Sequence, residues 1–179
     1  MFATALRYGS VSGAIIVGVI ILGIVLSTHD VNAGIFSSEY FGYLVMIVAL
    51  STIFLAIRDY RNKTLGGVIK FLPAFGLGLM IAFIAGIAYV IAWEIYLYAT
   101  HYSFMDHYVA SVLAHARAAG VTGAALDERV AQMEAMRTQY ANPLFRLPMT
   151  FLEIFPVGLL IALISAAVLR NPRALPERG

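Results

Sequence analysis

The sequence contains no cysteine and few charged residues, and each shortage excludes a class of protein. Without cysteine the chain has no disulfide, no thiolate metal site, no iron–sulfur cluster and no cysteine nucleophile. Charged residues make up 12% of the 179 positions and hydrophobic residues 61%, whereas a soluble domain carries about 25% charged residues. A chain with so little polar surface is expected to have a lipid bilayer as its solvent.

Catalytic signatures are also missing. The chain has no glycine-rich phosphate loop, no G-x-S-x-G nucleophile elbow and no H-E-x-x-H pair. The net charge of +2 and the pI near 9.0 do not indicate nucleic-acid binding, because the placement of the basic residues has a membrane explanation. We therefore expect no cofactor, no metal and no nucleic-acid partner.

Four apolar runs each approach the roughly 20 residues that a helix needs to cross a bilayer. They do not alternate between polar and apolar positions, as strands of a membrane barrel do. The sequence therefore predicts an all-α integral membrane four-helix bundle, a single domain over residues 1–179. The predicted spans are about 8–27, 41–57, 71–98 and 147–169.

The first run resembles a secretory signal because Val31-Asn32-Ala33 looks like a cleavage site. Signal peptides have apolar regions of about 7–15 residues, and this run is nearly twice that length. We expect a retained helix.

Lysine and arginine are concentrated in the second connection, which we expect between residues 58 and 70, and in the C-terminal tail. The first connection, from Thr28 to Tyr40, has none. Cytoplasmic segments carry the excess of positive charge. The pattern predicts a multi-pass membrane protein with both termini and the second connection in the cytoplasm.

The third connection, about Ala99 to Arg146, is expected to hold an extracytoplasmic helical hairpin over about 103–141. Ser103 and Asp106 form a predicted capping box for a first helix that ends at Ala118. The second helix carries one apolar stripe with steps of three and four, namely Leu126, Val130, Met133, Met136 and Tyr140.

Small residues predict where the spans pack, because helices in lipid approach closely only at such positions. Two stripes with four-residue steps are expected to face protein, and they are Gly78, Ala82 and Gly86 in the third span and Gly158, Ala162 and Ala166 in the fourth. In the first span, Gly13, Gly18 and Gly23 recur every five residues and define no single face.

Two acidic residues lie inside apolar runs, Glu94 in the third span and Glu153 in the fourth. Both are expected near the outer interface, since Glu94 lies roughly 36 Å along the helix from Lys70. Glu153 is about 140° around the helix from Gly158 and is expected to point towards another helix or a gap. Nearby polar candidates are His101, on the face of Glu94 if the helix continues that far, Asp106, His107 and Glu39.

These six residues leave three interpretations open: structural pairing, an ion or proton path, and a metal site. We favour pairing, because their spacing matches no metal motif.

Short motifs along nearly the whole chain resemble one family. They are Glu39 with Gly42-Tyr43, Tyr60-Arg61 with Gly66-Gly67, Trp93-Glu94, Phe104 with Asp106 and Tyr108, Asn142-Pro143, and Thr150-Phe151-Leu152-Glu153-Ile154-Phe155-Pro156-Val157-Gly158. The chain resembles the bacterial membrane family called domain of unknown function 4199. The resemblance implies a small multi-span inner-membrane protein and brings no activity, ligand or catalytic residue.

Three functions are compatible with these observations. We favour a non-enzymatic accessory or scaffold component, whose partners are the lipid bilayer and either a second copy of the chain or another membrane protein. The alternatives are an oligomeric ion- or proton-coupled carrier or channel that uses Glu94 and Glu153, and a membrane enzyme acting on a lipophilic substrate.

Overall fold

A computed structural model describes the backbone of residues 1–28 and 39–175 and the side chains of residues 1–22 and 41–175. The helices are α1 (Phe2–Thr28), α3 (Glu39–Leu50), α4 (Thr52–Leu65), α5 (Phe71–Ala99), α6 (Phe104–Ala118), α7 (Ala124–Ala141) and α8 (Pro143–Leu169). The described residues contain no strand, which confirms the predicted all-α class.

Four helical segments are long and apolar enough to cross a membrane: Phe2–Leu22, Phe41–Leu65, Phe71–Ala99 and Pro143–Leu169. The four apolar runs of the sequence therefore correspond to four candidate spans. Two predictions concern features outside the described residues: the segment Val31-Asn32-Ala33 and the side chain of Glu39.

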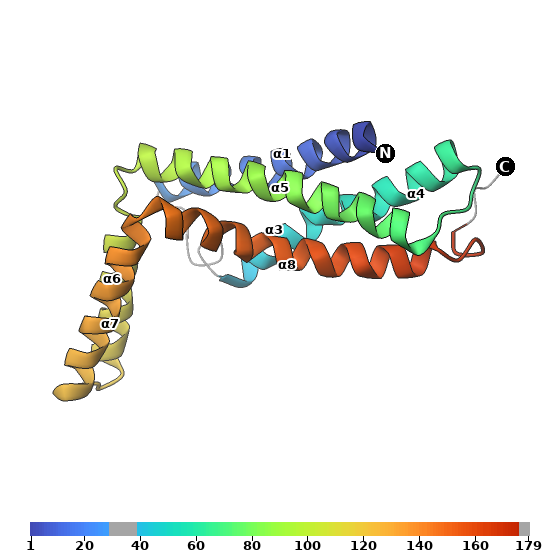
Figure 1. Cartoon of the computed structure of the whole chain (residues 1–179). Helices are drawn as coiled ribbons and strands as arrows, with labels where there is room; N and C mark the ends of the chain where they lie inside the picture. The colour runs from blue at the N-terminus through green and yellow to red at the C-terminus, as the bar shows by residue number, and fades with distance from the viewer. Residues whose placement is uncertain (29–38, 176–179) are drawn as a thin grey trace. The chain divides into compact units, whose positions relative to one another are not determined.

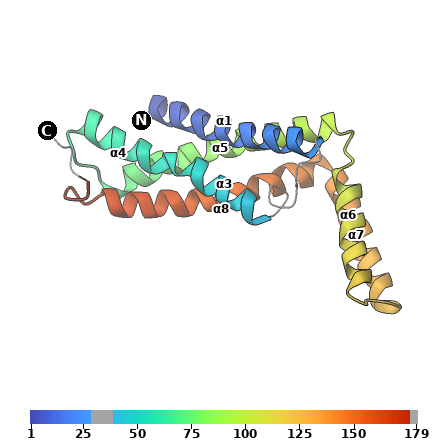
Figure 2. The same ribbon diagram turned by 180° about the vertical axis from the view of Figure 1, so that it is seen from behind.

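The chain divides into two compact units that are described separately. Unit 1 comprises Met1–Ala92 and Phe151–Gly179, and unit 2 comprises Trp93–Thr150. Unit 1 contains α1, α3 and α4 and most of α5 and α8, which run side by side (Figure 1 and Figure 2). The prediction of a single membrane domain over residues 1–179 stays a prediction.

The two stripes of small residues bring α5 and α8 into close contact in unit 1. A Cβ atom added to Gly78 would lie 2.6 Å from the Cβ of Ala162, and one added to Gly158 would lie 2.6 Å from the Cβ of Ala82. These pairs run in opposite directions along the two helices, so α5 and α8 are antiparallel. Their small residues allow the close backbone approach that substitutes for a hydrophobic force in lipid.

Helix α1 packs on α5 through Gly13 of the five-residue pattern and through Gly9, which lies outside that pattern. A Cβ atom on Gly9 would lie 2.8 Å from the side chain of Ile84, and one on Gly13 would lie 2.6 Å from the Cβ of Ala88. Gly9 and Gly13 are four residues apart and so share a helix face, whereas a Cβ on Gly18 would meet nothing within 4 Å. The contacts advance in the same direction along both helices, so α1 and α5 are parallel.

The second candidate span is interrupted at Ser51, between α3 and α4. The Ser51 hydroxyl donates a hydrogen bond to the Val48 carbonyl over 2.6 Å. A side-chain bond of this kind competes with the backbone hydrogen bonds of the helix. Next to the break, the buried hydroxyls of Ser12 and Thr52 are hydrogen-bonded to each other. This bond joins α1 to α4.

Helix α4 continues to Leu65, eight residues beyond the predicted end of the second span, so the predicted connection is wrong in extent. Lys63 pairs with Asp59 over 2.7 Å at an i, i+4 spacing, which supports the helix. Tyr8 of α1 also donates to Asp59 over 3.1 Å. The connection itself is short, and it turns at Gly66 and Gly67, whose φ angles of 65° and 94° suit glycine.

Arg61 of α4 is 1% exposed and binds the C-terminal end of α8. Its guanidinium donates to the carbonyls of Ala174 over 2.8 Å, Leu175 over 2.7 Å and Leu169 over 3.4 Å. Leu169 is the last residue of α8, where the helix dipole is negative. Backbone carbonyl dipoles therefore replace the water that this buried cation has lost.

Unit 2 contains the pair of helices α6 and α7, joined by a short turn at Gly120 and Gly123. Helix α6 ends at Ala118, as the sequence predicts. The predicted capping box is wrong, because Ser103 makes no side-chain cap hydrogen bond, and Asp106 instead pairs with Arg137 of α7 over 2.8 Å. Met133 of the predicted apolar stripe is 8% exposed. That this helix pair lies outside the cytoplasm stays a prediction.

Candidate functional site

Glu94 of α5 and Arg146 of α8 form a bidentate ion pair within unit 2. Arg146 Nε donates to Glu94 Oε1 over 2.6 Å, and Arg146 Nη2 donates to Oε2 over 2.8 Å. The Arg146 side chain is 6% exposed and that of Glu94 26%. Parallel charge-assisted bonds of this kind are strong and fix geometry. Both oxygens of Glu94 are therefore engaged by one partner.

Arg146 is also held by the end of α7. Its Nη1 donates to the carbonyls of Tyr140 over 3.1 Å and Ala141 over 3.4 Å, at the negative end of that helix. Its guanidinium carbon lies 5.3 Å from the Tyr102 ring centroid and 5.9 Å from that of Tyr140. Trp93 Nε1 donates to the Tyr140 hydroxyl over 2.7 Å. Arg146 thus joins the last turns of α5, the residues after it, α7 and α8.

Helix α8 begins at Pro143, four residues before the predicted span, and this earlier start makes Arg146 helical. The Asn142 side chain accepts a hydrogen bond from the Leu144 backbone N–H over 3.0 Å, and its carbonyl accepts one from the Arg146 N–H over 3.0 Å. Proline suits the first helical position, where its missing N–H has no partner to lose. Asn142-Pro143 therefore places Arg146 one turn into the helix.

His101 does not share a helix face with Glu94, because α5 ends at Ala99. His101 and Tyr102 have φ angles of 52° and 58°, in the left-handed region. The Tyr102 N–H donates to the Leu97 carbonyl over 2.7 Å, the six-to-one bond of a Schellman helix end. The chain thus turns the Tyr102 ring towards Arg146 and leaves His101 exposed.

Glu153 has a different partner, in unit 1. Tyr89 Oη of α5 donates to Glu153 Oε2 over 3.0 Å. Tyr89 is 7% exposed, whereas Glu153 is exposed. The sequence predicts that Glu153 points towards another helix or a gap, and the partner that the structure shows is a long tyrosine side chain that reaches it from the third span. Glu94 and Glu153 therefore belong to separate units and have separate partners.

The remaining candidates do not form a cluster in the described part of the chain. Asp106 is paired with Arg137, and His107 is exposed on α6. Across the described residues, no three His, Asp or Glu side chains gather in a group that could hold a metal ion.

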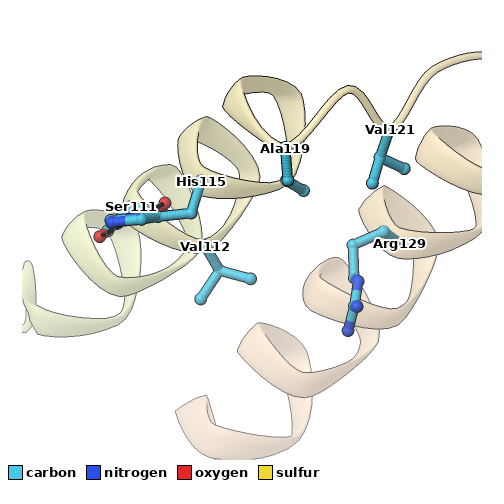
Figure 3. Close-up of a pocket in the computed structure, with 7 residues that line it drawn as sticks. Ser111, Val112, His115, Ala119, Val121 and Arg129 are labelled. Carbon is cyan, nitrogen blue, oxygen red and sulfur yellow. Dashed lines mark hydrogen bonds between the residues drawn. The ribbon is translucent and has the colours of Figure 1, made fainter.

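A pocket lies between α6 and α7, and its lining includes none of the six predicted residues. Figure 3 shows Ser111, Val112, His115 and Ala119 on α6 and its end, with Arg129 on α7. Val121 and Ala116 complete the lining. His115 Nδ1 lies 2.8 Å from the Ser111 carbonyl of its own helix. The pocket is mostly apolar with a basic rim.

Sequence reasoning missed Arg146 and Tyr89 as partners of the two glutamates. Arg146 had a usable signal, because it is the last cation before a long apolar run, where an unpaired charge is costly. Tyr89 had none, because a tyrosine within an apolar span is ordinary.

The fold and the paired carboxylates define the class: an all-α membrane protein with four candidate spans and a short helix pair between the third and fourth. The chain belongs to the family described as protein of unknown function (DUF4199), whose match covers residues 7–171. No curated protein and no solved structure matches it.

Proposed function

We propose that this protein is a non-enzymatic accessory or scaffold component of the bacterial inner membrane. The observation that supports this is the separate pairing of Glu94 with Arg146 and of Glu153 with Tyr89. A carboxylate that carries protons or ions must exchange partners during transport. Glu94 is instead held through both oxygens by a nearly buried arginine, an arrangement that suits a structural pair.

The directions of the helices support the proposed topology. In unit 1, α1 and α5 are parallel and α5 and α8 antiparallel, as expected for four successive crossings. Both termini would then be cytoplasmic, together with the cations at the end of α4, and the α6–α7 pair would lie on the opposite side. We propose that this pair meets the partner, a second copy of the chain or another membrane protein.

The first experiment separates a scaffold from a carrier. Proteoliposomes containing the wild type, Glu94→Gln or Glu153→Gln are compared with protein-free vesicles for proton and cation flux, and Glu128→Gln on the exposed surface of α7 is the matched control. We expect no flux above that of the protein-free vesicles. Flux that disappears in Glu94→Gln or Glu153→Gln but persists in Glu128→Gln would establish the carrier instead.

A second experiment tests for the partner. The protein is extracted from its native membrane in mild detergent and examined by native mass spectrometry. We expect a complex of defined stoichiometry that chemical cross-linking joins through α6 or α7. A lone monomer under these conditions would contradict the proposal.

A further inference from the structure

Unit 1 carries a strongly basic end, where α4 and α8 end and α5 begins (Figure 1). Its described cations belong to four helices and the segments next to them, and its described acid is Asp59. We call this set the basic end, and it comprises Arg7, Arg58, Arg61, Lys63, Lys70, Arg170, Arg173 and Asp59.

Contacts within unit 1 hold these residues at one end. Tyr8, next to Arg7, donates to Asp59, which also binds Lys63. Arg61 binds the carbonyls that follow α8, near Arg170 and Arg173. Residues of α1, of α4 and of the segment after α8 therefore lie at one end of unit 1, and Arg61 belongs to them from a buried position.

The register of α5 and α8 brings Lys70 and Arg170 to the same end of unit 1. The contacts of Gly78 with Ala162 and of Gly158 with Ala82 define an antiparallel alignment, and its continuation places the backbone of Lys70 level with that of Arg170. Both side chains are exposed, and neither has a hydrogen-bond or ion-pair partner in the described part of the chain. Two exposed, unpaired cations at the same level of a helix pair favour the binding of an anion.

Exposed apolar side chains occur on the same helix ends as the exposed cations. Leu72 is 74% exposed two residues after Lys70, Val168 is 43% exposed two residues before Arg170, and Phe2 is 67% exposed five residues before Arg7. A helix end that carries both exposed apolar residues and a cation complements an amphiphile, whose acyl chain lies along the helix while its charged headgroup meets the cation. A soluble anion would use only the charges.

We propose that the basic end binds the headgroups of anionic phospholipids, with Lys70 and Arg170 as the central pair. Asp59 weakens this binding, because it neutralises Lys63. The inference is independent of the accessory function, since it requires only that this end meets a bilayer surface.

The test uses the full chain in a neutral detergent with equimolar phosphatidylglycerol and phosphatidylcholine, and native mass spectrometry counts the bound lipids. We expect phosphatidylglycerol to be retained preferentially and the preference to fall as salt screens the charges. In Lys70→Gln/Arg170→Gln the affinity for phosphatidylglycerol should fall roughly five-fold per cation removed. Lys70→Arg/Arg170→Lys should retain it, and Asp59→Asn should raise it.

The matched control is Arg117→Gln/Arg129→Gln, which removes two exposed cations from α6 and α7. It should leave the lipid preference unchanged, and circular dichroism should show the same helicity in every variant. Four results would overturn the proposal: equal retention of both lipids, an equal loss in the control, displacement of phosphatidylglycerol by millimolar inorganic phosphate, or capture of an acidic protein in place of lipid by the same residues.

Discussion

Arg146 donates two parallel hydrogen bonds to Glu94 while its remaining donor group binds the end of α7. The carboxylate lies on α5 and the guanidinium on α8, 52 positions apart in the chain. This single contact brings together the segments that precede and follow the α6–α7 pair. We therefore expect the Glu94–Arg146 pair to stabilise unit 2.

Glu94→Gln should destabilise the protein, because it leaves Arg146 charged and nearly buried without its counterion. Breaking a buried ion pair from one side costs about 3–5 kcal/mol, and the partial exposure of Glu94 places the expected cost at the lower end. The measurement is the free energy of unfolding by steric trapping in bicelles. The double variant Glu94→Gln/Arg146→Gln should cost less than the sum of the single variants. Strict additivity would show that the pair contributes nothing beyond its separate residues.

His101→Gly should stabilise the protein by about 0.5–1 kcal/mol, because His101 is exposed and its φ of 52° is strained for a residue with a Cβ atom. Tyr102→Gly relieves the same strain but removes the ring beside Arg146, so it should be neutral or destabilising. Thermal midpoints in one detergent compare the two variants. Equal stabilisation by both would show that the Tyr102 ring contributes nothing.

Gly78→Ala should destabilise the α5–α8 contact by about 1–3 kcal/mol through overpacking, since its Cβ would lie 2.6 Å from that of Ala162. Gly76→Ala on the same helix is the control, because a Cβ there meets nothing within 4 Å, and alanine should be neutral or slightly favourable. Unfolding free energies decide between them. If both substitutions had the same effect, the close approach of α5 and α8 would be contradicted.

Ser12→Ala and Thr52→Val each remove the hydroxyl contact between α1 and α4. Interhelical hydrogen bonds in membrane proteins average about 0.6 kcal/mol in double-mutant cycles, so a coupling energy of that size is expected. Ser10→Ala, at an exposed position of α1, is the control. A cycle without coupling would mean that the two hydroxyls stabilise their own helices only.

Arg61→Gln should release residues 170–175 from α4, because three carbonyls lose their charged donor. We expect faster amide hydrogen exchange and faster proteolysis in that segment. The free energy of unfolding should fall by at most about 1.5–3 kcal/mol for each charged hydrogen bond lost. Arg58→Gln on the same helix is less buried and should leave the segment protected. Unchanged exchange in Arg61→Gln would contradict the anchoring role.

The sequence predicted which segments are helical better than it predicted where each helix begins and ends. Apolar length identifies a span, but α4 and α8 extend past their apolar runs because the polar residues there find partners: Asp59 binds Lys63, and Arg146 binds Glu94. The capping box failed for a related reason. Asp106 has a different partner in Arg137, which is remote in sequence and near in space.

The sequence by itself determined the helical class, the four apolar segments and the small residues at which α5 and α8 meet. These features follow from local composition and from the 3.6-residue period, which need no knowledge of neighbours. Only the tertiary structure decided the partners of Glu94, Glu153 and Arg61. Each pairing joins residues more than 50 positions apart, and the geometry of a hydrogen bond depends on how whole helices pack.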